Sequence, residues 1–95
     1  MYISKERQER YERAEKEHQA LVREARNFKA LIDSLNLGLY ANVSISGRGV
    51  HVYVKQADDR MARLMERKSW TIPAEELLKL SDEEQKQLAL ELEIA

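Results

Sequence analysis

The sequence predicts one small α+β domain, because the spacing of apolar residues changes along the chain. Apolar side chains recur every three to four residues over 4–35, as on one face of a helix. They alternate with polar ones over 39–55, as in a β-hairpin, and two short helical patterns follow at 74–80 and 82–93. Ninety-five residues suffice for one core, so we expect a single domain over 1–95.

The long helix over 4–35 carries a seven-residue apolar repeat that is typical of a coiled-coil seam. The seam positions are Tyr11, Ala14, His18, Leu21, Ala25, Phe28, Ile32 and Leu35. A helix of this length spans about 48 Å, more than one small core needs. We therefore expect part of it to contact a partner, with a homodimer through the six positions from Tyr11 to Phe28, in either parallel or antiparallel orientation.

The hairpin over 39–55 has a glycine-rich turn, Gly47-Arg48-Gly49. One of its faces is purely aliphatic and should pack on the second half of the long helix. The other face carries Tyr40, Asn42, Ser44, His51 and Tyr53. Two strands alone leave both sheet edges open, so we expect a third strand, a covering helix or a second subunit to complete the sheet.

The segment after the hairpin predicts that covering helix over 57–68. Its inner side would be Met61, Leu64 and Met65, and its outer side Arg60, Arg63 and Arg67. The extended stretch 69–73 could supply a short edge strand, because Pro73 disfavours helical geometry at Ile72. Ser81 and Glu84 form a capping-box pattern that opens the last helix.

Charge is distributed unevenly along a chain whose net charge is −1. Residues 36–72 hold six basic and three acidic side chains, and residues 73–95 hold two and seven. The candidate partner-binding surface consists of Tyr40, Asn42, Arg48, His51, Tyr53, Arg60, Arg63 and Arg67. It could bind an acidic protein or a nucleic-acid backbone, or it could be solvated or neutralised by the acidic tail.

Enzymatic chemistry has no sequence support. Because cysteine is absent, the chain can form no disulfide, thiolate zinc site or cysteine nucleophile, and a reducing cytoplasm is the simplest compartment. The glycines of the turn precede a strand rather than the helix that a phosphate loop requires. The two histidines have no acid, serine or cysteine at a diagnostic spacing. We expect no catalytic residue, no cofactor and no metal.

Two further expectations concern His18 and the start of the chain. His18 could fix the register of the seam, or act as a protonation switch. Residues 1–13 carry both charge signs and no apolar run, so we expect neither a signal peptide nor a membrane span.

These observations predict a non-catalytic protein-interaction module that is homodimeric. Small proteins without recognisable motifs are frequent among phage and mobile-element accessory proteins, which bind and modulate or inhibit a host protein. Two alternatives stay open. One is a nucleic-acid-associated regulator that uses the basic helix face 60–68, and the other is a structural assembly subunit.

Overall fold

The computed structural model describes residues 5–57 and 67–95, and for residues 5–7 and 11 the backbone alone. The elements in chain order are α1 (Lys5–Leu35), β1 (Leu39–Ser46), β2 (Gly49–Gln56), β3 (Ser69–Pro73), α2 (Ala74–Leu78) and α3 (Asp82–Ile94). The predicted α+β class is confirmed: a long first helix is followed by an antiparallel sheet and two short helices.

The sheet has three antiparallel strands in the order β1-β2-β3, so a third strand completes the predicted hairpin. The third strand is formed by 69–73, the stretch that was expected to be able to supply an edge strand. Val43 pairs with Val52 across the hairpin, and Tyr53 pairs with Thr71 on the other side. The central position of β2 therefore brings residues of all three strands onto one surface.

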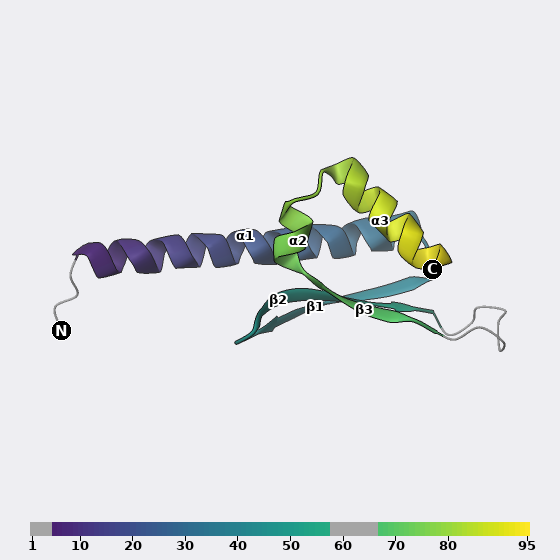
Figure 1. Cartoon of the computed structure of the whole chain (residues 1–95), viewed down its shortest axis with the longest axis horizontal. Coiled ribbons are helices and arrows are strands. Elements are labelled where there is room, and N and C mark those ends of the chain that lie inside the picture. Colours follow the sequence, from purple (N-terminus) through teal and green to yellow (C-terminus); the bar gives the residue numbers. More distant parts are fainter. Residues whose placement is uncertain (1–4, 58–66) are drawn as a thin grey trace.

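The helices α1, α2 and α3 lie on one face of the sheet (Figure 1). The first helix packs across β1 and β2 through Phe28 and Ile32, which meet the inward-pointing Val52 and Val54 in a fully buried core. Leu77 of α2 completes that core. The aliphatic face of the hairpin thus lies on the second half of α1, as the alternation predicts.

Two buried glutamines attach the C-terminal helices to the rest of the fold. The Gln56 amide nitrogen donates to the carbonyls of Leu92, at 3.3 Å, and Ala95, at 3.0 Å. Gln85 of α3 donates to the Leu77 carbonyl at 3.0 Å and to the carboxylate of Glu24 on α1. The acidic tail is therefore docked on α1 and on the end of the sheet.

Short-range backbone and side-chain interactions define the C-terminal end of α1 and the N-terminal end of α3. Asn36 ends α1 with a φ of 49°, the left-handed conformation that asparagine tolerates. The Ser81 hydroxyl accepts from the Glu84 amide at 3.2 Å, and the Glu84 carboxylate accepts from the Ser81 amide at 3.1 Å, which confirms the capping box. The first of the two short helices, α2, ends at Leu78, two residues before the predicted end.

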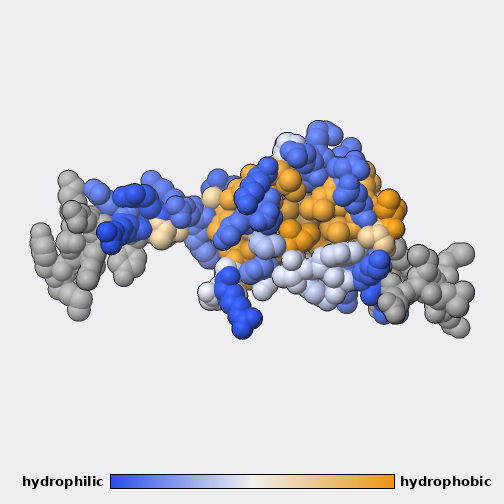
Figure 2. All heavy atoms as spheres, in the orientation of Figure 1, coloured by the Kyte–Doolittle hydropathy of each residue, from blue (hydrophilic) through white to orange (hydrophobic). Residues whose placement is uncertain are grey.

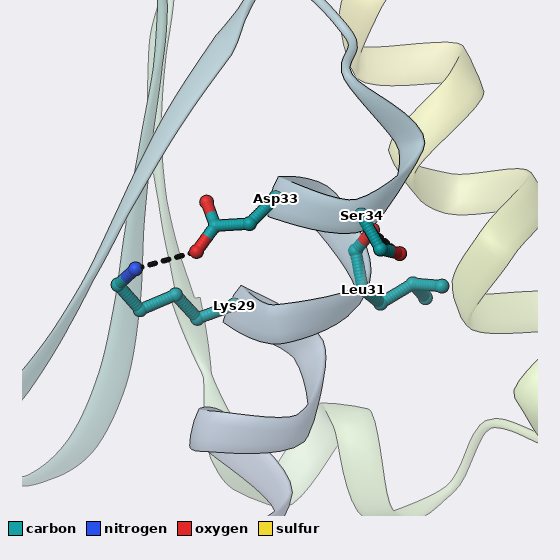
Figure 3. A network of polar contacts seen from close by, with 4 residues as sticks. All are labelled: Lys29, Leu31, Asp33 and Ser34. Carbon is teal, nitrogen blue, oxygen red and sulfur yellow. Dashed lines mark hydrogen bonds and ion pairs between the residues drawn. The ribbon is translucent and has the colours of Figure 1, made fainter.

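Surface contacts on the last turns of α1 are local (Figure 3). Lys29 forms an ion pair with Asp33 at 2.7 Å, and the Ser34 hydroxyl donates to the Leu31 carbonyl at 2.8 Å. Both contacts join residues one helical turn apart, so they support the helix itself and hold no other element.

The predicted covering helix over 57–68 falls mostly on residues 58–66, which lie outside the described part of the chain. The flanking residues that are described, Ala57, Arg67 and Lys68, are not helical. In the C-terminal helices, Leu77 and Leu92 are buried, whereas Leu78 and Ile94 are exposed. Among the described residues, no helix has an apolar stretch that could cross a membrane.

Candidate functional site

Within residues 5–57 and 67–95, the sheet has one face that no helix covers, and we call this surface the open sheet face. It is formed by Tyr40, Asn42, Ser44, His51, Tyr53, Lys55, Ser69 and Thr71. Successive side chains of a strand point to opposite faces. Because the helices bury the aliphatic positions, these alternate positions remain in solvent. Every one of these side chains is exposed except His51, which is half-buried.

Two tyrosines give the open sheet face its apolar contact area. Tyr40 is 56% exposed and Tyr53 is 40% exposed. The ammonium of Lys55, the cross-strand partner of Tyr40, lies 5.9 Å from the centre of that ring. This distance is at the outer limit of a cation–π contact, so the ring and the ammonium both remain available to a partner.

The remaining open-face side chains are neutral hydrogen-bonding groups next to the tyrosines. Asn42 pairs with Tyr53 across the hairpin, and Thr71 flanks Tyr53 from β3. Ser44 pairs with His51. A ring with hydroxyls and an amide beside it combines apolar area with adaptable hydrogen bonds, a composition that is common in protein recognition surfaces.

No carboxylate belongs to the strands or to the turn between them. Residues 39–57 and 67–73 contain no aspartate or glutamate, and they contain Arg48, Lys55, Arg67 and Lys68. Arg48 is exposed at the hairpin tip, and the last two follow at the other end of the sheet. The acidic helices α2 and α3 lie on the opposite face (Figure 1). In the described part of the chain, the acidic tail therefore does not cover the open sheet face.

The structure divides the predicted partner-binding surface into two parts. Tyr40, Asn42, His51 and Tyr53 lie together on the open sheet face, and Arg48 lies at its tip. Of the three arginines predicted for the outer side of the helix over 57–68, Arg60 and Arg63 lie outside the described residues. Arg67 is described and exposed, and it precedes β3 rather than belonging to a helix.

The predicted seam is divided between the core and solvent. Ala25 and Phe28 are fully buried in the chain's own core, so they are not available to a second molecule as the seam prediction required. Leu21 is half-buried, and Ala14 and His18 are exposed. The N-terminal part of α1 projects beyond the sheet (Figure 1). The side chain of Tyr11 lies outside the description.

Hydrophobic residues gather on the helix side of the molecule. Figure 2 shows them over the region of α2 and α3, whereas the projecting part of α1 is mostly hydrophilic. Described side chains at positions 8–10 and 12–19 are all exposed. The described side chains in the projecting part of α1 thus offer a partner little apolar area.

Sequence reasoning missed the contribution of β3 to the open sheet face. Ser69 and Thr71 are exposed there, while the intervening Trp70 and the following Ile72 pack against the core. Their alternation was visible in the sequence, but five residues carry too short a pattern to separate a strand from a linker.

The described surface carries hollows that are open to solvent. One hollow of about 600 Å³ lies between α1 and the start of α3, with Glu24, Asn27 and Asp82 in its wall. No group of three or more histidine, aspartate or glutamate side chains in the described residues could hold a metal ion. Comparisons with protein-family models, with curated proteins and with solved structures gave no match.

Proposed function

We propose that this protein is a non-catalytic interaction module that binds an acidic protein partner through the open sheet face. The observation that carries the proposal is the pair of exposed tyrosines, Tyr40 and Tyr53, on a sheet face without carboxylates. Tyrosine is enriched at protein interfaces because it presents a large rigid surface with a polar tip. Lys55 and Arg48 would favour a partner with negative charge.

Such a module fits the accessory role inferred from the sequence, in which a small phage or mobile-element protein binds and modulates or inhibits a host protein. The absence of cysteine fits a reducing cytoplasm as the compartment. Under this proposal the protein acts by binding to the surface of a partner. The residues of the open sheet face therefore determine the affinity for that partner rather than the rate of a reaction.

Affinity capture with matched variants tests the protein partner. We expect the double variant Tyr40→Ser/Tyr53→Ser to lose the proteins that the unaltered chain captures from a lysate of its cell of origin. Leu78→Ser is the control, because Leu78 is 49% exposed on the helix side and should not contact the partner. Capture of the same proteins by the double variant would refute the open sheet face as the binding surface.

Charge reversal distinguishes recognition at a defined site from nonspecific electrostatic binding. Lys55→Glu places a carboxylate in the open sheet face, and we expect at least a tenfold loss of affinity for an acidic partner. Lys86→Glu makes the same change on the exposed side of α3 and should leave the affinity unchanged. Equal losses in both variants would indicate a net-charge effect without a defined site.

A second candidate is a single-stranded nucleic acid, and the same face favours it. Bases stack on tyrosine rings, and lysine and arginine contact the phosphates. Anisotropy of a labelled single-stranded oligonucleotide, titrated with salt, tests this candidate. Each phosphate contact adds roughly 0.7 to the slope of log affinity against log salt, so Lys55→Glu should lower that slope. No binding at low salt would exclude it.

A further inference from the structure

The two edges of the sheet differ in how well they are protected from pairing. The outer edge of β3 belongs to a five-residue strand that ends in Pro73, which has no N–H to donate. The outer edge of β1 belongs to an eight-residue strand, Leu39–Ser46, with no charged residue and no proline. Charges and proline are common means of blocking an edge, and the sequence of β1 has neither.

Two backbone contacts establish which groups of β1 point outward. The backbone N–H of Gln56 donates to the Lys68 carbonyl at 3.0 Å on the β3 side. The backbone N–H of the next residue, Ala57, donates to the Gly38 carbonyl at 2.9 Å on the β1 side. Backbone groups alternate in direction along an antiparallel strand. Residues 40, 42 and 44 of β1 therefore bond to β2, and residues 41, 43 and 45 direct their amides and carbonyls away from the sheet.

These outward groups have no backbone partner within the described residues. Neither the strand register nor the contacts between elements supplies one for Ala41, Val43 or Ile45. Ile45 also has an exposed side chain, 51% accessible, although its position in the alternation points toward the helix side. An unpaired backbone row and an apolar side chain thus lie together at one edge.

We propose that this edge pairs with β1 of a second copy of the chain, antiparallel and centred on Val43. In that register Val43 lies opposite its own equivalent, and Ala41 lies opposite Ile45 of the second copy. Both are pairs that exchange two backbone hydrogen bonds. On the other face Asn42 lies opposite Ser44 of the second copy. The strand is uncharged, so self-pairing brings no like charges together.

The partner of the β1 edge is a second copy of the chain, because this edge is complementary to itself and the pairing of two such edges produces a closed dimer. The contact would cover the exposed Ile45 side chain with the second strand. Pro73 and the short length of β3 leave no equivalent edge for further growth, so assembly stops at a twofold dimer with a continuous six-stranded sheet. The two open sheet faces then join into one, although the pairing does not depend on what binds them.

Light scattering on matched lysine variants tests this edge. Ile45→Lys puts an inward-pointing charge at the edge, and we expect the dimer to dissociate, with at least a tenfold rise in its dissociation constant. Thr71→Lys makes an equal charge change at an exposed position of β3 and should remain dimeric. Circular dichroism confirms that both variants are folded. A dimer that survives Ile45→Lys, an unaltered chain that is monomeric at all concentrations, or growth beyond the dimer would overturn the proposal.

Single cysteines give the register directly, because the natural chain has none. Asn42→Cys mixed with Ser44→Cys should oxidise to the mixed disulfide, since directly opposite residues of this type have Cα atoms about 4.5 Å apart. Asn42→Cys alone should cross-link poorly, because its two copies lie on a diagonal of about 7–8 Å. Cross-linking of Ala14→Cys in place of the mixed pair would assign dimerisation to the helix seam and refute the β1 edge.

Discussion

Replacement of Gln56 by methionine should destabilise the fold far more than a surface change of the same kind. The Gln56 side chain is 2% exposed. Its amide nitrogen donates to the Leu92 and Ala95 carbonyls, and its carbonyl accepts from the Lys68 amide at 3.0 Å. Methionine has a similar length but cannot form these bonds. Without Gln56, the carbonyl of the exposed Ala95 can accept a hydrogen bond from water, whereas the carbonyl of the buried Leu92 cannot.

The magnitude follows from the groups that would stay unsatisfied. The Leu92 carbonyl and the Lys68 backbone amide would each lose this partner, at a cost of about 1–3 kcal/mol per group, and the extra apolar burial of methionine returns about 1 kcal/mol. The free energy of unfolding should therefore fall by about 1–5 kcal/mol, which is roughly a 5- to 4,000-fold change in the folding equilibrium.

Urea unfolding followed by circular dichroism, at one protein concentration, measures this loss. Gln87→Met is the control, because Gln87 is exposed on α3 and the change there should stay within about 0.5 kcal/mol. A Gln56→Met variant as stable as this control would show that the amide does not hold α3 against the sheet.

Three other perturbations have outcomes that the contacts determine. Phe28→Ala should lower the free energy of unfolding by about 3–5 kcal/mol because Phe28 is fully buried, whereas His18→Ala should change it by less than about 0.5 kcal/mol, both measured in urea. Ser81→Ala removes the hydroxyl of the capping box and should cost about 1 kcal/mol in thermal unfolding. Asn36→Val should cost about 1–2 kcal/mol at a φ of 49°, whereas Asn36→Gly should be tolerated. Equal stability of the two Asn36 variants would contradict the left-handed cap.

Local patterns predicted the elements well because each is set by neighbouring residues. The helix stop at Asn36, the hairpin turn at Gly47 and the capping box at Ser81 depend on backbone preferences within a few positions. The aliphatic alternation from Leu39 to Val54 also fixed which side chains face the helices. Five members of the open sheet face could therefore be named from the sequence, because a period of two assigns faces without knowledge of the partner layer.

Long-range contacts could not be predicted in the same way. The inward position of Gln56 follows the alternation of the preceding valines, yet its bonds to Leu92 and Lys68 depend on where α3 docks. The seam had a related ambiguity. A seven-residue repeat indicates that one face of a helix is covered, but Phe28 and Ala14 occupy equivalent positions and differ completely in burial. Which molecule covers such a face depends on the rest of the fold.

The placement of charge across the sheet gives the uneven sequence composition a structural meaning. The acid-rich segment 73–95 folds against α1, so the exposed carboxylates of Glu75, Glu83 and Glu91 lie on the helical layer. The strands carry no carboxylate at all. The two faces therefore differ in sign, and an acidic partner that approaches the helical layer is repelled, whereas one that approaches Lys55 is attracted. This separation would orient a partner before contact, and because screening removes it, the association rate should fall as salt rises even for a protein partner.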